Sequence, residues 1–167
     1  MEQDAQPKWE GKVSAELRKA TVDQIWLLLK DFFNIHKWFP NLSTCYGVHG
    51  SNGELGCIRY GAGFAIPSDS TGNWAKERLI AIDHVDRSLT YEMVDCNIGF
   101  ESYKATMKVV PGVGVNDQGG CTIHWFFTVD PVEGWTLDDM VNQYQVSLQI
   151  MANNMEDEIA NSVDPGS

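Results

Sequence analysis

The sequence predicts an α+β fold in which a curved, seven-stranded antiparallel β-sheet wraps around one long C-terminal helix, with two short helices after the first strand. Two observations predict it. Short segments of alternating apolar and polar residues follow one another closely between turn residues, which is typical of an antiparallel meander rather than of βαβ units. The final segment instead repeats apolar residues every three or four positions, the period of a helix. This helix has to bury its apolar stripe against the sheet, because no other element remains to cover it.

The first expected elements are a strand and two short helices. Apolar or small residues occupy every second position over Trp9–Leu17, which indicates a half-buried strand. The run Thr21–Gln24 matches a capping box and opens a helix that continues to Leu29. A second short helix is expected over Phe33–Trp38, and Pro40 ends it because proline disfavours a helical residue before it.

Six further strands, separated by turns, are expected before the last helix. Their ranges are Cys45–His49, Gly56–Gly63, Asn73–Ile82, Ser88–Asp95, Glu101–Val110 and Cys121–Val129. The last helix has Thr136 as its N-cap and carries its apolar stripe from Leu137 to Ile159. A coiled coil is the competing explanation of this stripe. It is less favoured because the stripe is short and the strands need cover.

Length and charge restrict the kind of protein and its partners. The 167 residues predict one domain over 1–167, with an ordered core from about residue 8 to about residue 163. Asp and Glu outnumber Lys and Arg by 23 to 12, so the chain has a formal charge of −11. Such a charge repels nucleic acid and anionic membrane surfaces. The simpler alternative is that it only keeps the protein in solution. A monomer is expected, because no apolar stripe is left unassigned.

Location and metal binding follow from what the sequence lacks. The first residues have no apolar leader, and no run of about 18 apolar residues occurs, so we expect a cytoplasmic protein without membrane insertion. The four cysteines have no CxxC spacing, and the four histidines have no spacing typical of metal ligands. We therefore expect reduced thiols and no metal site.

The strand over Asn73–Ile82 contains the most unusual position. Its Lys76 and Arg78 face suits solvent, which turns Glu77 inward among small and apolar residues. A buried carboxylate is costly unless it is paired or protonated, and Arg59 on the strand Gly56–Gly63 is the natural partner. The pair could hold a polar group of a ligand inside a hollow. The alternatives are a half-exposed Glu77 on an edge strand and a purely structural ion pair.

The inward faces of the later strands and of the last helix supply the expected wall of this hollow. Tyr103 adds a phenolic hydroxyl to it. The residues expected to contact a ligand are Leu79, Tyr91, Met93, Met107, Trp125, Phe127, Tyr144 and Leu148. The alternative role of these aromatic residues and methionines is ordinary core packing.

Six short blocks of the chain carry a family resemblance. They are Lys8–Lys12, Leu29–Phe32, His36–Lys37, Gly56–Tyr60, Trp74–Leu79 and Tyr103–Met107. In these blocks the sequence resembles the plant lachrymatory-factor synthases and their close relatives. That group belongs to the helix-grip superfamily, together with the major birch pollen allergen, the abscisic-acid receptors, START lipid-transfer domains and polyketide cyclases. The resemblance implies the same fold as the strand pattern does.

The resemblance also implies an activity. It is the rearrangement of a small alkenyl sulfenic acid to a thial S-oxide, with Arg59 and Glu77 in the proton transfers, Tyr103 as a hydroxyl of the pocket, and no cofactor or metal. The segment Gly61–Asn73 differs from the synthases and is expected to form a lid at the cavity mouth, which leaves the substrate open. The alternative is a non-catalytic carrier or receptor of a hydrophobic plant metabolite, lipid or hormone.

Overall fold

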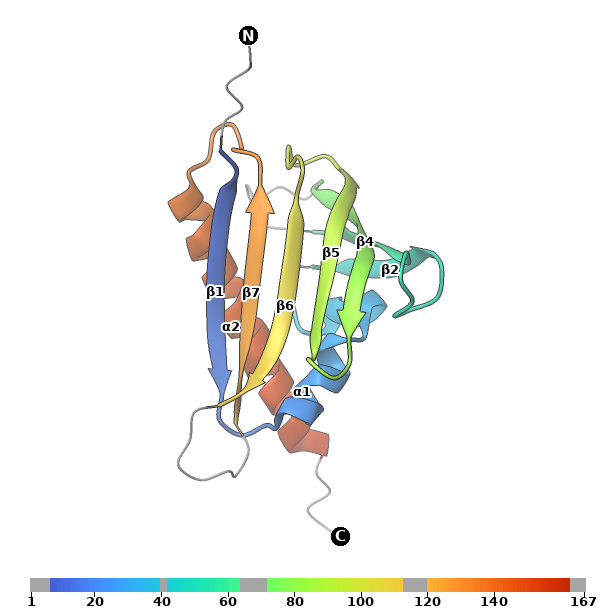
Figure 1. Cartoon of the computed structure of the whole chain (residues 1–167), viewed down its shortest axis with the longest axis vertical. Helices are drawn as coiled ribbons and strands as arrows, with labels where there is room; N and C mark the ends of the chain where they lie inside the picture. The colour runs from blue at the N-terminus through green and yellow to red at the C-terminus, as the bar shows by residue number, and fades with distance from the viewer. Residues whose placement is uncertain (1–6, 40–41, 64–71, 113–119, 163–167) are drawn as a thin grey trace.

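Seven antiparallel strands form one sheet in the order β1-β7-β6-β5-β4-β3-β2 in the computed structural model (Figure 1). The structure describes residues 7–39, 42–63, 72–112 and 120–162. The strands are β1 (Trp9–Leu17), β2 (Thr44–His49), β3 (Ile58–Ala62), β4 (Trp74–Asp83), β5 (Ser88–Cys96), β6 (Lys104–Pro111) and β7 (Cys121–Val129). Two short helices, α1 (Val22–Leu29) and the 3-10 helix η1 (Phe32–Lys37), follow β1, and α2 (Leu137–Ser162) ends the described chain. The predicted fold class is confirmed.

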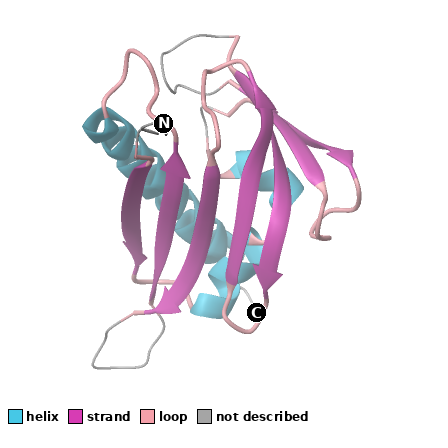
Figure 2. Cartoon of the chain, turned by 45° about the horizontal axis from the view of Figure 1, so that its top comes forward, coloured by secondary structure: helices cyan, strands magenta, loops and turns pink. Residues whose placement is uncertain are grey.

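Helix α2 lies across one face of the sheet, behind β1, β7 and β6 in Figure 1. The apolar stripe explains this position, because Leu148, Met151 and Met155 are fully buried. Burial of each such side chain contributes about 1.5–3 kcal/mol. Thr136 caps the helix, since its Oγ1 accepts a hydrogen bond from the amide of Asp139 at 3.0 Å. The sheet curves around this helix, and α1 and η1 cover the same face under β4 and β5 (Figure 2).

Helix α1 begins as its sequence predicts. The Thr21 Oγ1 accepts from the Gln24 amide at 3.1 Å, and the Gln24 Oε1 accepts from the Thr21 amide at 2.9 Å, so the capping box is complete. Ile25, Trp26 and Leu29 are buried on its inner face. The helix therefore brings the chain back under the sheet and directs η1 toward β3 and β2.

Several element bounds differ from the expected ones, for local backbone reasons. Strand β3 starts at Ile58 rather than Gly56, because Gly56 has a positive φ of 89° and the Cys57 amide closes a turn onto Glu54. Strand β6 starts at Lys104 rather than Glu101, because Ser102 has a φ of 56°. The second short helix is a 3-10 helix over Phe32–Lys37. Of the expected lid, residues 64–71 lie outside the described residues, so the lid stays a prediction.

Candidate functional site

A cavity lies between the inner face of the sheet, η1 and the middle of α2. Its volume is about 130 Å³, close to the ~150 Å³ of an engineered cavity that binds benzene. The lining residues are Ile35, Phe39, Leu42, Cys45, Arg59, Gly61, Glu77, Tyr91, Met93, Ile98, Phe100, Tyr103, Trp125, Gln143, Tyr144, Val146, Ser147 and Ile150. Most of these side chains are apolar or aromatic, so the few polar groups among them determine how a ligand could be oriented.

Arg59 and Glu77 form an ion pair in the cavity wall. They are direct cross-strand neighbours on β3 and β4, and both strands turn these positions inward. The Arg59 Nε donates to the Glu77 Oε1 at 2.9 Å, and the two side chains are only 9% and 12% exposed. Strand β4 is an interior strand of the sheet, so a half-exposed Glu77 on an edge strand is ruled out. The expected contact between these two residues is therefore present.

Helix η1 and strand β5 supply the remaining contacts of Arg59. The Arg59 Nη1 donates to the main-chain oxygen of Phe32 at 2.9 Å. Its guanidinium carbon lies 3.9 Å from the centroid of the Phe32 ring and 4.9 Å from that of the Tyr91 ring, in the geometry of cation–π contacts. Burial alone would lower the pKa of Arg59, but the charge of Glu77 raises it above its ordinary value. The guanidinium therefore stays protonated and is held rigidly.

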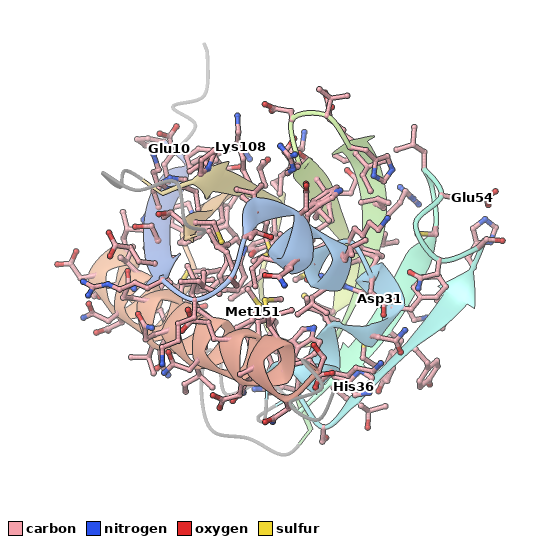
Figure 3. All side chains as sticks on the ribbon, turned by 90° about the horizontal axis from the view of Figure 1, so that it is seen from below. Glu10, Asp31, His36, Glu54, Lys108 and Met151 are labelled. Carbon is pink, nitrogen blue, oxygen red and sulfur yellow. The ribbon has the colours of Figure 1, made fainter. Side chains whose placement is uncertain are left out.

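The turn between β2 and β3 positions η1 against the site. The Asn52 Nδ2 donates to the Asp31 Oδ1 at 2.7 Å, and the amide of Phe33 donates to the Asn52 Oδ1 at 3.0 Å. The ring of Phe33 lies directly over Gly47, where a larger residue would overlap it. In Figure 3, Asp31 and His36 lie on the side of the molecule that carries this hairpin, and Met151 points from α2 toward the sheet. These contacts fix the Phe32 oxygen that accepts from Arg59.

Three buried tyrosines form the second polar feature of the cavity wall. The Tyr144 Oη donates to the Tyr103 Oη at 2.6 Å, and the Trp125 Nε1 donates to the Tyr91 Oη at 3.2 Å. Burial is the main cause that raises the pKa of each of the three phenols well above its ordinary value. The phenols are therefore neutral hydrogen-bonding groups around an ion pair whose net charge is zero.

These three phenols are expected to resist ionisation as the pH rises. Their folded-state pKa values lie above the ordinary value near 10, so the stability they confer is complete below about pH 10 and is lost above it. Spectrophotometric titration at alkaline pH should show that the three buried tyrosines ionise only when the protein unfolds. Circular dichroism over the same pH range measures the unfolding. Reversible ionisation of all five tyrosines in a protein that stays folded would contradict this.

The structure separates the predicted site residues into two groups. Those that line the cavity are Arg59, Glu77, Tyr91, Met93, Tyr103, Trp125 and Tyr144. Those that pack in the core away from the cavity are Leu79, Met107, Phe127 and Leu148. Both groups are on inward faces, but only part of each inward face borders the hollow. Cys45, Ile98 and Phe100 also line it and were not expected. Two of them, Ile98 and Phe100, lie in the β5–β6 connection, where no periodic pattern marks an inward face.

Two features are absent from the part of the chain that the structure describes. Within 7–39, 42–63, 72–112 and 120–162, no group of three or more His, Cys, Asp or Glu side chains is arranged to hold a metal ion. No helix in these ranges is long and apolar enough to span a bilayer. The four cysteines are free thiols, and Cys45 borders the cavity.

An antiparallel sheet that grips a helix around an apolar cavity defines a cavity-containing protein of the helix-grip class. The chain belongs to the family described as polyketide cyclase / dehydrase and lipid transport, whose sequence model matches residues 8–158. This match establishes the wider family that the sequence blocks imply.

Three solved structures of bacterial proteins are similar to this chain. The protein XoxI of Bacillus cereus superposes with a TM-score of 0.69 at 18% identity, covering 91% of this chain and 96% of that one. An uncharacterised protein of Bacillus thuringiensis gives 0.68 at 19% identity, with 87% and 98% covered. A solution structure from Thermobifida fusca gives 0.67 at 26% identity, with 87% and 92% covered. The likeness to the two Bacillus proteins supports the fold alone.

Proposed function

We propose that the cavity binds a small, uncharged, mainly apolar molecule by one polar group, and that Glu77 moves a proton on that molecule without a cofactor. The observation that carries the proposal is the Arg59–Glu77 pair, 2.9 Å apart and largely buried in an otherwise apolar and aromatic wall. A carboxylate in such surroundings can act as a general acid–base group, because it lies in the wall of the cavity where a bound molecule would contact it.

Charge and size support an uncharged, small ligand. Arg59 already has its counter-charge in Glu77, and the three phenols around them are neutral. A ligand with its own charge would enter an apolar cavity without a partner, at a cost of several kcal/mol. The volume of about 130 Å³ favours a molecule of the size of benzene over a long-chain lipid.

The narrower form of the proposal is an isomerase that converts a small alkenyl sulfenic acid into a thial S-oxide. The Glu77 carboxylate takes the proton of the S–O–H group, and Arg59 holds the oxygen as it becomes negative. The proton then returns to the far carbon of the C=C bond. The O–H bond breaks and leaves its electron pair on oxygen. The C=C electron pair forms the new C–H bond with the proton, and an electron pair of the sulfur forms the C=S bond. The substrate and the product are isomers, and the carboxylate is regenerated.

The second candidate is a carrier of a small hydrophobic molecule, without turnover. The specific observation in its favour is that Arg59 is already satisfied by Glu77 and by the Phe32 oxygen, and is packed against two rings. An arginine held in this way can serve as a structural element of the wall while the ligand binds by apolar contacts alone.

Binding and turnover of matched probes test both candidates. Native mass spectrometry should show binding of benzyl alcohol. Benzoate, which is similar in size but carries a negative charge, should not bind. A small alkenyl sulfenic acid generated in situ should be isomerised, and Glu77→Gln should reduce the rate at least about 100-fold. Glu92→Gln is the matched control, because Glu92 pairs with Arg78 at 2.8 Å outside the cavity. Binding without turnover identifies a carrier, and absence of binding contradicts both candidates.

A further inference from the structure

The two edges of the sheet differ in how they are protected. Strand β1 is one edge; it carries the exposed charges Glu10, Lys12 and Glu16, and α2 packs against it. Strand β2 is the other edge, and among the described residues its outer backbone edge has no strand partner. Figures 1 and 2 show β2 and β3 projecting together at the end of the sheet opposite β1. An unpaired edge is a template for another strand unless charge, proline or a cover prevents pairing.

The chain around β2 has no charge to prevent such pairing. No Asp, Glu, Lys or Arg occurs between Lys37 and Glu54, although the whole protein has a formal charge of −11. Two copies of an acidic protein repel each other over most of their surface. They can approach most closely where that surface is uncharged, and β2 is such a place.

The outer face beside this edge is apolar and aromatic. Tyr46 is 51% exposed, Val48 is 46% exposed, and Leu55 in the following turn is 64% exposed. The ring of Tyr46 lies 5.2 Å from that of Tyr60, which lies 6.1 Å from that of Trp74. A row of aromatic rings therefore crosses β2, β3 and β4 on the face away from α2 and ends at the free edge. A strand added at β2 would extend this row and cover Tyr46 and Val48.

We propose that β2 pairs antiparallel with β2 of a second copy of this chain about a twofold axis, which joins the two sheets into one. An antiparallel strand pair is self-complementary under such an axis, so one surface serves both partners. The twofold brings the two Tyr46 side chains, and the two Val48 side chains, onto the same side of the joined sheet. The hairpin that would form the interface also contributes Cys45 and Arg59 to the cavity. The proposal does not depend on the proposed function.

Sedimentation velocity of the full chain, from micromolar to submillimolar concentration, tests this. We expect a monomer–dimer equilibrium. Its dissociation constant should fall as sodium chloride is added, because salt screens the repulsion between two acidic molecules. Hydrogen exchange at the amides of Thr44–His49 should slow as the dimer forms. A monomer at every concentration in high salt, or a dimer that leaves these amides unprotected, would overturn the proposal.

Substitutions at the edge identify the interface. Val48→Lys should raise the dimer dissociation constant at least about tenfold, because two like charges would lie close across the joined strands. Val48→Glu should do the same, which shows that the charge itself and not its sign is responsible. Val85→Lys is the matched control, since Val85 is exposed in the β4–β5 turn away from β2. A dimer that neither Val48 variant weakens would refute pairing between two copies. A monomer whose β2 amides become protected from hydrogen exchange only when a basic peptide is added would also refute it, because the edge would then bind a different partner.

Discussion

Replacing Glu77 with Leu is expected to lower the free energy of unfolding by about 3–5 kcal/mol, because it leaves the charge of Arg59 buried without its partner. The Arg59 side chain is only 9% exposed, and its remaining contacts are the Phe32 oxygen and two aromatic rings. These groups are dipoles and cannot replace a full negative charge. Equilibrium unfolding in urea, followed by circular dichroism, measures the loss.

The double variant Arg59→Met with Glu77→Leu distinguishes this explanation from a simple loss of packing. It removes both charges, keeps similar volumes, and should unfold within about 1 kcal/mol of the wild type. The free energy of unfolding of Glu77→Gln should lie between those of Glu77→Leu and of the double variant, because the amide oxygen can still accept from the Arg59 Nε. If Glu77→Leu alone is as stable as the wild type, the Arg59–Glu77 pair is hydrated rather than buried.

Most of the fold could be predicted because its longest elements are clearly periodic. Strand β1 alternates over its whole length, and the stripe of α2 keeps the helical period over several turns. The errors lie where one residue interrupts a pattern. Gly56 and Ser102 both have positive φ values, and a positive φ at the non-glycine Ser102 leaves no signal in the alternation of apolar and polar residues. Such positions shift the start of a strand without changing the fold.

The candidate site was predictable only in part, for a physical reason. Alternation identifies the face of a strand, and it places the opposite charges of Arg59 and Glu77 on the inward faces of two neighbouring strands, so their contact could be expected. Alternation does not indicate which residues of an inward face lie next to the cavity and which lie farther along the strand. Tyr91 borders it, whereas Phe127 on the same face of the sheet packs in the core. The oxygen of Phe32 belongs to the backbone, so no side-chain pattern can indicate it.

Gly11 shows how the core behind the cavity limits what the sequence can tolerate. Gly11 lies on β1 directly opposite Phe127 on β7, and a Cβ placed on it would overlap the Phe127 ring. That ring is fully buried and lies 4.4 Å from the ring of Tyr144, so it can move aside only if packed neighbours move with it. Gly11→Ala is therefore expected to lower the free energy of unfolding by about 3 kcal/mol, measured in urea. Gly72→Ala is the control. A Cβ there meets nothing within 4 Å, so its effect should stay within about 1 kcal/mol.

A double-mutant cycle tests whether the overlap with Phe127 is the cause. Phe127→Leu alone leaves a void and should cost about 1–3 kcal/mol, whereas the same change in the Gly11→Ala protein gives the new methyl group room. The double variant should then be more stable than the sum of the two single losses predicts, by at least about 1 kcal/mol. Additive losses would show that Gly11 is required for another reason. Because Phe127 packs on Tyr144, and Tyr144 bonds to Tyr103 at 2.6 Å, Gly11→Ala should also weaken ligand binding in a cavity that Gly11 does not touch.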